Sequence, residues 1–93
     1  MNQDIVVAKN ANVVARQLAE SEGAVLLNLQ SGAYHGLNPV GLLVWELIDA
    51  ERTVRQLVEA VREAVTDPPT ALEADVHGFL ENALERDLIR TSP

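Results

Sequence analysis

The chain has 93 residues, of which 47% are hydrophobic and 23% are charged. This composition is typical of a globular protein, and the length leaves room for only one small core, which excludes most enzymes. We expect a single domain over residues 1–93, with an ordered core over about residues 5–90. Seven basic and fourteen acidic residues give a net charge of −7, which disfavours binding to nucleic acid.

The sequence contains no cysteine, so it has no disulfide, no thiol nucleophile and no thiolate metal ligand. Its longest apolar run, Val40–Trp45, is far shorter than the roughly 20 residues that cross a bilayer. The N-terminus lacks the basic region and the apolar stretch of a signal peptide. We therefore expect a cytoplasmic protein without a membrane partner.

Three stretches in the first third of the chain favour β-strands. Ile5–Ala8 and Val13–Leu18 alternate imperfectly, and either of them is a candidate for the first strand. Ala24–Leu29 is more regular and is apolar on both faces, as expected of the middle strand of a sheet. The residues expected on its main apolar face are Val25, Leu27 and Leu29, with Leu26 on the other face.

A hairpin is expected next. Gln30-Ser31-Gly32 suits a three-residue loop whose glycine takes a positive φ, and Ala33–Leu37 then forms an edge strand. Because no comparable strand signal follows, the outer backbone groups of residues 33–37 should lack partners. Such an open edge can pair with a peptide or with a second copy of the chain.

The remainder of the chain has helical periodicity. Asn38 as N-cap and Pro39 at the first position predict a helix that runs to about Asp49. Its inward positions, at helical spacing, are Val40, Leu43, Val44, Leu47 and Ile48. Trp45 lies off this stripe and is expected either to pack under the N-terminal segment or to contact a partner.

Two more helices are each introduced by a capping-box pattern. Thr53 with Gln56 begins the second helix, which residues 66–69 end with two prolines. Thr70 with Glu73 predicts a longer third helix over residues 70–87. The apolar stripe of the second helix is Val54, Leu57, Val58, Val61 and Val65. That of the third helix is Leu72, Val76, Phe79, Leu80, Ala83 and Leu84, after which Leu88 and Ile89 close the domain.

This order of elements predicts an α+β fold in which a three-stranded antiparallel sheet is followed by three helices. The short link between the last two helices makes the arrangement similar to a winged helix-turn-helix unit. Helices that read DNA present basic and amide side chains to the bases. Arg86 is the only cation between Thr70 and Asp87, which opposes a DNA-binding function for the third helix.

Catalytic patterns are missing from the sequence. His35 and His77 lie in different predicted elements without a metal-binding motif. We expect His35 at the rim of the edge strand and His77 on the solvent side of the third helix. The carboxylates of that helix favour a solvated face rather than an acid–base pair. The sequence therefore predicts a protein that is not an enzyme and that binds no metal or cofactor.

The remaining feature is an open strand edge beside an apolar helix. A peptide can add itself to such an edge as another strand and direct alternate side chains toward the helix. The helical wall would consist of Leu72, Asp75, Val76, Phe79 and Ala83. Phe79 is either a wall residue or plain core, and Tyr34 is either a filler on the sheet face or a contact for a bound chain.

One longer pattern spans most of these elements. It consists of Ala24–Gly41, with the hairpin glycine and the motif Tyr-x-x-Leu-Asn-Pro-x-Gly, followed by Trp45-Glu46-Leu47, Thr53-Val54, Asp75-Val76, Phe79-Leu80 and Leu88-Ile89. In this combination the chain resembles, over Val13–Arg90, the PqqD-like family of recognition elements for ribosomally synthesised, post-translationally modified peptides. Within the family it is more similar to the stand-alone proteins of lasso-peptide pathways than to the pyrroloquinoline-quinone protein itself.

This resemblance implies a non-catalytic protein that binds the leader of a precursor peptide as an antiparallel strand on residues 33–37, against the third helix. The implied contacts are Ala33, Tyr34, His35 and Gly36 on the strand and Asp75, Val76 and Phe79 on the helix. The implied partners are a separate leader peptidase, which receives the leader, and a lasso cyclase, which then closes the core peptide. Two alternatives stay open: a PqqD-type chaperone of another peptide-modification pathway, and a winged-helix transcriptional regulator.

Overall fold

The computed structural model covers residues 1–93 and describes residues 2–18 and 23–92, which form six strands and three helices. In chain order these are β1 (Val6–Lys9), β2 (Val13–Gln17), β3 (Ala24–Asn28), β4 (Tyr34–Leu37), α1 (Pro39–Leu47), β5 (Arg52–Thr53), α2 (Val54–Ala64), α3 (Leu72–Glu85) and β6 (Ile89–Ser92). The predicted α+β class and the three helices are confirmed. The winged-helix likeness is not confirmed.

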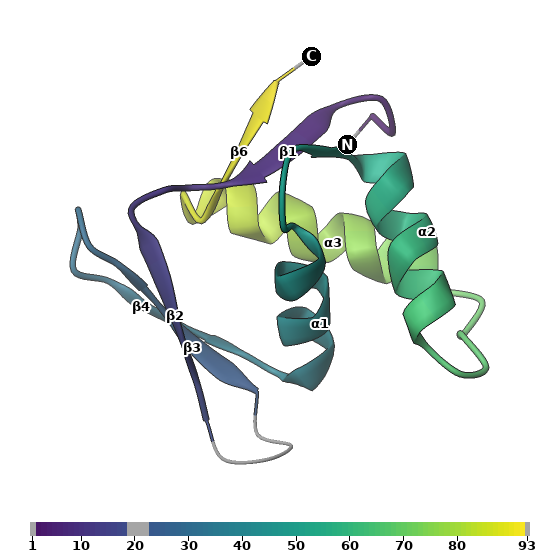
Figure 1. The fold of residues 1–93 in the computed structure, drawn as a ribbon, viewed down its shortest axis with the longest axis horizontal. Helices are drawn as coiled ribbons and strands as arrows, with labels where there is room; N and C mark the ends of the chain where they lie inside the picture. Colours follow the sequence, from purple (N-terminus) through teal and green to yellow (C-terminus); the bar gives the residue numbers. More distant parts are fainter. Residues whose placement is uncertain (1, 19–22, 93) are drawn as a thin grey trace.

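The strands form two antiparallel sheets, whereas the sequence predicted one. The sheet orders are β5-β1-β6 and β2-β3-β4, so both candidates for the first strand are strands, one in each sheet. β5 and β6 were not predicted, because each is short and pairs with β1 from far along the chain: Val7 lies opposite both Arg52 and Thr91. Figure 1 shows the β2-β3-β4 sheet on the left, α1 in the centre, and β1 and β6 side by side above α3.

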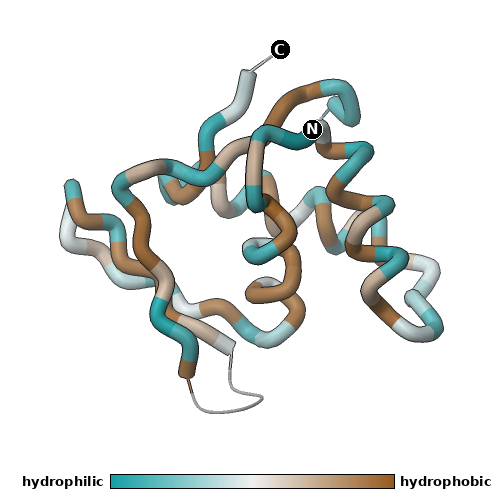
Figure 2. Tube along the Cα trace, in the orientation of Figure 1, coloured by the Kyte–Doolittle hydropathy of each residue, from teal (hydrophilic) through white to brown (hydrophobic). Residues whose placement is uncertain are grey.

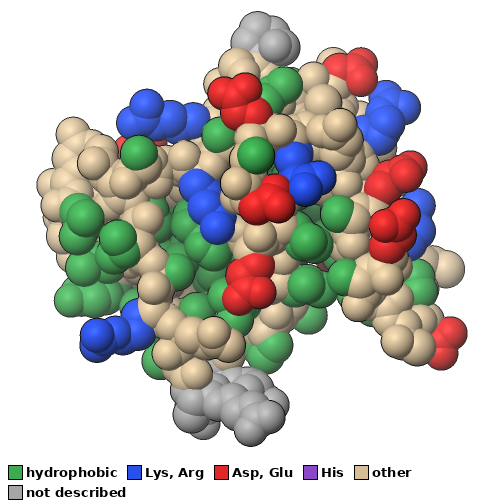
Figure 3. Space-filling view, viewed as in Figure 1, with side chains coloured by type: hydrophobic (Ala, Val, Ile, Leu, Met, Phe, Trp, Pro, Cys, Tyr) green, Lys and Arg blue, Asp and Glu red, His purple; other side chains and the backbone are tan. Residues whose placement is uncertain are grey.

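β3 is the middle strand of its sheet, as predicted, but the prediction of which of its faces packs on the core was wrong. Ala24, Leu26 and Asn28 are buried, whereas Leu29 is 60% exposed. The core packs on the side of Leu26, and alternation then turns Val25 and Leu27 to the opposite face, where they are only half-buried. Figure 3 shows hydrophobic side chains gathered on the side of this sheet and charged ones around α2.

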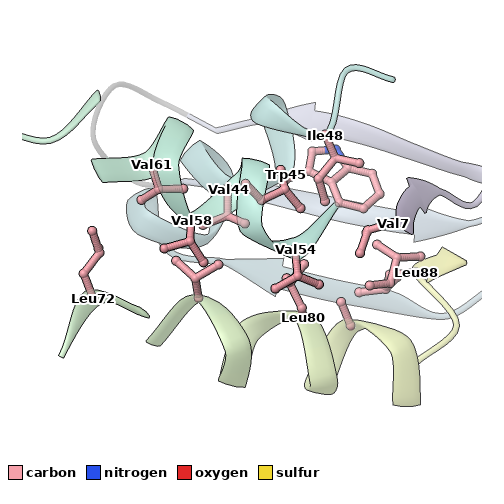
Figure 4. Packing of buried hydrophobic residues seen from close by; sticks show 14 of the residues in the cluster. Val7, Val44, Trp45, Ile48, Val54, Val58, Val61, Leu72, Leu80 and Leu88 are labelled. Carbon is pink, nitrogen blue, oxygen red and sulfur yellow. The ribbon is translucent and has the colours of Figure 1, made fainter. Parts of the chain in front are cut away.

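The core lies between the three helices, and β1 and β3 cover it. Figure 4 shows valines of α1 and α2 meeting Leu72 and Leu80 of α3, with Val7 and Leu88 at one end. α1, hydrophobic along most of its length (Figure 2), packs through a stripe rotated from the predicted one. Its buried residues are Gly41, Val44, Trp45 and Ile48, whereas Val40 is 57% exposed. Gly41 leaves room for the Phe79 ring of α3, since a Cβ atom on Gly41 would lie 3.2 Å from Cε1 of that ring.

Trp45 packs under the N-terminal segment, the first of its two predicted alternatives. It is buried in the core, and Nζ of Lys9 on β1 lies 4.9 Å from the centroid of its ring. The cation above the ring face adds an electrostatic contact between β1 and α1.

Two of the three predicted helix caps are present. The Asn38 side chain accepts a hydrogen bond from the Gly41 N–H at 2.7 Å, and Thr53 forms the full capping box with Gln56. α1 ends at Leu47 rather than near Asp49. The Thr70–Glu73 box was wrong: a turn in which the Leu72 N–H donates to the Pro69 carbonyl delays the helix.

α3 consequently occupies Leu72–Glu85 rather than residues 70–87, and its N-cap residue is Ala71. The Glu73 side chain accepts a hydrogen bond from Nε2 of Gln3 instead of capping the helix. The predicted stripe is buried at Leu72, Val76, Leu80 and Ala83, whereas Leu84 is 41% exposed. His77 is half-buried rather than solvent-facing, and its buried Nε2 has no hydrogen-bond partner among the described residues.

Two buried asparagines anchor the end of α3 to both sheets. Asp87 has a φ of 62°, which turns the chain out of the helix. Its carbonyl accepts hydrogen bonds from Nδ2 of Asn10 at 2.8 Å and from Nδ2 of Asn28 at 3.5 Å. Asn10 follows β1 and Asn28 ends β3, so this turn fixes the C-terminal half of α3 beside the β2-β3-β4 sheet.

Two glycines shape the strands that face α3. Gly32 has a φ of +77°, which confirms the positive φ predicted for the hairpin. The loop is longer than the predicted three residues, because Asn28 pairs with Ala33 and residues 29–32 lie between them. Gly23 has a φ of +87°, and a Cβ atom there would lie 1.9 Å from the Leu37 carbonyl oxygen. A side chain at residue 23 would therefore separate the start of β3 from the end of β4.

Candidate functional site

A hollow of about 520 Å³ lies between β4 and the C-terminal half of α3. Its lining from the strand side is Tyr34, His35, Gly36 and Leu37, together with Asn38 and Gly41 at the start of α1. Its lining from the helix side is Gly78, Phe79, Asn82, Ala83 and Arg86, followed by Leu88. One wall is thus a strand and the other a helix, which is the combination expected from the sequence.

The apolar end of the hollow is built around Phe79. Its ring is half-buried, packs against the core and also lines the hollow, so the two alternatives for this residue are not exclusive. A Cβ atom on Gly41 would lie 3.2 Å from Cε1 of Phe79 and 3.5 Å from Cδ2 of Leu37. Glycine at residue 41 therefore gives the ring the space it occupies.

The polar end of the hollow is built around Arg86. Its Nε donates a hydrogen bond to Oδ1 of Asn82 at 2.7 Å, one helical turn earlier. Its Nη1 lies 3.3 Å from Nδ1 of His35 on β4. Because guanidinium nitrogens only donate, Nδ1 of His35 is the acceptor. His35 lies at the strand rim, as predicted, and joins the strand wall to the helix wall.

β4 is an edge strand that pairs with β3, and within residues 2–18 and 23–92 no strand pairs with its other side. The Asn28 N–H donates to the Ala33 carbonyl at 3.0 Å. Because hydrogen-bonded and non-bonded pairs alternate along an antiparallel ladder, His35 and Leu37 direct their backbone groups to β3. The same alternation leaves the backbone N–H and C=O groups of Tyr34 and Gly36 on the free edge.

Side-chain directions on β4 follow the same two-residue period. His35 lies opposite Leu26 and Leu37 lies opposite Ala24, so both share the core-facing side of the sheet and border the hollow. Tyr34 belongs to the opposite face and is 71% exposed. It is therefore not a buried filler of the sheet.

The structure brings together five of the nine residues predicted as peptide contacts. Those that line the hollow are Tyr34, His35, Gly36, Phe79 and Ala83. Leu72 and Val76 lie in the core, and Asp75 is exposed in the first turn of α3. Ala33 precedes β4 and bonds to Asn28 through its carbonyl. The hollow lies beside the second half of α3, whereas most of the predicted wall belongs to the first half.

Seven lining residues were not among the predicted contacts, although Leu37 lies within the predicted binding strand of residues 33–37. They are Leu37, Asn38, Gly41, Gly78, Asn82, Arg86 and Leu88. A signal for three of them was available: Gly78, Asn82 and Arg86 are spaced four residues apart and share one side of a helix. A glycine within a helical pattern also indicates close approach of another group.

Reactive or membrane-spanning features are not evident in the described ranges. Residues 2–18 and 23–92 hold no group of three or more His, Asp or Glu side chains that is arranged to bind a metal ion. Among the same residues, even the longest helix, α3 with 14 residues, is too short to cross a membrane. The chemistry offered by the hollow is that of hydrogen bonding, apolar contact and one cationic side chain.

Comparisons with known proteins give matches in sequence and in structure. The sequence model of the family described as coenzyme PQQ synthesis protein D (PqqD) matches residues 23–89. None of the curated proteins is significantly similar to the sequence. A similar solved structure is TbiB1 in complex with the TbiA(beta) leader peptide, at 28% identity and a TM-score of 0.73, covering 89% of this chain and 94% of that one.

Two further structures share the fold at lower identity. One is a lasso peptide synthetase B1 complexed with its leader peptide, at 20% identity and a TM-score of 0.68, covering 94% of this chain and 98% of that one. The other is the PqqD part of Methylobacterium extorquens PqqCD, described as a stand-alone recognition element for ribosomally synthesised and post-translationally modified peptides. It is 21% identical with a TM-score of 0.71, covering 91% of this chain and 88% of that one.

Proposed function

The chain belongs to the PqqD family, and from this premise we propose that it binds the leader segment of a ribosomally synthesised precursor peptide without catalysing a reaction on it. TbiB1 and the lasso peptide synthetase B1 were each solved with a leader peptide, and the PqqD structure is a recognition element. The observation that carries the proposal for this chain is the free edge of β4 beside a hollow walled by α3.

In this proposal the leader adds to β4 as an antiparallel strand. Its backbone exchanges hydrogen bonds with Tyr34 and Gly36, whose N–H and C=O groups are on the free edge. Every second side chain of the leader enters the hollow and contacts Phe79 or Ala83. The main-chain bonds contribute affinity for any extended peptide, and the hollow contributes selectivity.

The other predicted contact residues support this site to different degrees. Ala33 directly precedes β4 and Asp75 is exposed in the first turn of α3, and neither of them lines the hollow. Leu72 and Val76 act through the core, because their buried side chains hold α3 in place.

We further propose that the pathway makes a lasso peptide. The shared fold with a lasso peptide synthetase B1 and the hairpin-to-helix motif support this choice. The partners would then be a separate leader peptidase and a lasso cyclase, acting in the cytoplasm, where precursor peptides are made. Holding a disordered leader next to a docked peptidase raises the effective concentration of the cleavage site.

A second candidate is a PqqD-type chaperone of another peptide-modification pathway. The observation that favours it is the match to the PqqD family model over residues 23–89. The two candidate functions use the same hollow and the same mode of peptide binding. They differ in the leader that binds, so a titration with leaders of both kinds separates them.

The test of the proposal is fluorescence anisotropy with a labelled synthetic leader of the precursor encoded beside this chain. We expect saturable binding that Phe79→Ala weakens by about tenfold or more, because a bound leader would cover the half-buried ring and make it a central aromatic contact. The matched control is Leu84→Ala, which truncates an exposed apolar residue of the same helix outside the hollow.

Circular dichroism melts of both variants show whether the fold is retained. Loss of binding by Phe79→Ala in a folded protein, with binding retained by Leu84→Ala, is the expected result. If Phe79→Ala loses stability and binding in proportion, then Phe79 acts only through the core. If the unmodified protein binds no leader at concentrations far above micromolar, the proposed function is wrong.

A further inference from the structure

Arg86 provides a positive charge in the hollow, although the chain as a whole is strongly acidic. The net charge is −7, and the ion pairs formed among the described residues join Arg52 to Asp49 and Arg55 to Asp4. Arg86 has no carboxylate partner within residues 2–18 and 23–92. Its Nε is bound to Asn82 and its Nη1 contacts His35, whereas Nη2 has no hydrogen-bond partner among those residues. The side chain is therefore oriented but not neutralised.

The spacing between the apolar and the polar end of the hollow matches the two-residue repeat of an extended peptide. Leu37, at the apolar end, and His35, at the polar end, are two residues apart on the same side of β4. Residues two apart in a strand are separated by about 6.8 Å, and a strand added to β4 has the same repeat. One leader side chain therefore meets Leu37 and Phe79, and the side chain two residues away meets His35 and Arg86.

The pairing geometry brings these leader side chains close to β4. His35 and Leu37 bond to β3, so on the free edge they form the non-bonded pairs of an antiparallel ladder. In such pairs the Cβ atoms of opposite residues lie about 4.5–5.5 Å apart, closer than in hydrogen-bonded pairs. A carboxylate on the residue opposite His35 is then within reach of the Arg86 guanidinium, which contacts the His35 ring at 3.3 Å.

We propose that Arg86 selects leaders that carry Asp or Glu two residues after an apolar anchor. The inference rests on the proposed function, that is, on antiparallel addition of a leader to β4. Because β4 runs from Tyr34 to Leu37, an antiparallel strand passes Leu37 first and His35 second, which sets the order as apolar and then acidic. A carboxylate rather than an amide is selected, because a guanidinium with a free donor binds carboxylate oxygens with charge-assisted bonds.

The acidic surface strengthens this selectivity. Elsewhere on the chain an acidic leader meets net repulsion, because the chain carries seven more acidic than basic residues. The Arg86 cation in the hollow offsets this repulsion only for a carboxylate in the correct register. A leader with its carboxylate one residue earlier or later would direct that side chain to the opposite face of the strand.

The test is a charge-exchange cycle measured by fluorescence anisotropy. The probe is the labelled leader used above, and its variants carry Gln or Lys at the position two residues after the apolar anchor. The protein variants are Arg86→Gln and Arg86→Glu, and the matched control is Arg62→Gln, which removes an exposed arginine of α2 outside the hollow.

We expect Arg86→Gln and the leader Gln variant each to weaken binding about fivefold, the effect of about 1 kcal/mol for a partly exposed ion pair. The two changes together should weaken it no further, since they remove the same contact. Arg86→Glu should bind the Lys variant better than it binds the original leader. Arg62→Gln should leave the affinity nearly unchanged.

Three results would overturn the inference. The leader sequence itself does so if the residue two positions after the anchor is not acidic. The second is that Arg86→Gln and the leader Gln variant weaken binding independently, so that the double change multiplies the two losses of affinity. The third is that Arg62→Gln weakens binding as much as Arg86→Gln does, which would indicate general charge attraction. In these cases leader binding is still observed and the proposed function stands, whereas complete absence of leader binding removes both.

Discussion

At Gly78, a substitution that stabilises α3 should also reduce the space that the hollow offers to a leader. It lies within α3 and lines the hollow, and a Cβ atom added there meets no atom within 4 Å. Alanine is favoured over glycine inside a helix by about 1 kcal/mol. For a chain of 93 residues with an unfolding entropy of about 2.1 cal/mol/K per residue, this raises the melting temperature by about 5 °C.

The same methyl group occupies space that the leader needs. Overpacking a close contact costs about 1–3 kcal/mol, so Gly78→Ala should weaken leader binding at least about fivefold. Thermal melts by circular dichroism and anisotropy titrations measure the two effects on one protein sample. Ala74→Gly, at an exposed position of α3 outside the hollow, is the control and should lower the melting temperature without changing the affinity.

Each measurement on Gly78→Ala can refute one part of this reasoning. A higher melting temperature with unchanged affinity would mean that the bound leader does not reach Gly78. An unchanged or lower melting temperature would mean that the space beside Gly78 does not accept a side chain. The expected combination, a more stable protein that binds less well, is a trade-off between stability and function at a single glycine.

Two further predictions concern the free edge and the anchored turn. Gly36→Pro removes an N–H that faces away from β3, so leader binding should fall about tenfold or more with little loss of melting temperature. Gly36→Ala keeps the N–H and adds a Cβ atom in open space, so it should bind normally, and equal binding by the two variants would contradict strand addition. Asn10→Ala leaves the Asp87 carbonyl with only the long hydrogen bond from Asn28 and leaves the Asn12 N–H without its side-chain acceptor, and urea titration should show a loss of about 1–3 kcal/mol in the free energy of unfolding. A loss below about 0.5 kcal/mol, the range of ordinary surface substitutions, would show that the asparagine does not anchor the turn.

The sequence by itself determined the elements whose signals are local. The Asn38 cap, the Thr53–Gln56 capping box and the Gly32 hairpin loop were each predicted, because their partners lie within a few residues. β4 was predicted as an edge strand because no comparable strand signal follows it; β5 and β6 do follow, but both pair with β1 and leave the edge of β4 open. The edge strand itself therefore needed no tertiary information, whereas its position beside α3 joins segments far apart in the chain.

Tertiary structure decided everything that joins distant segments. β5 and β6 form because each pairs with one side of β1. A segment as short as Arg52–Thr53 carries no strand signal of its own. The orientation of β3 also depended on which face the helices cover, because a strand that is apolar on both faces does not specify its direction.

The composition of the hollow is the clearest example of this division. His35 and Arg86 lie 51 residues apart in the chain, and their contact follows from the turn at Asp87, which Asn10 and Asn28 hold against both sheets. The sequence could assign Arg86 only to a helix, because side-chain periodicity specifies a face and not the element that covers it. Its position opposite His35 was decided by packing, since the core fixes where along β4 the end of α3 lies.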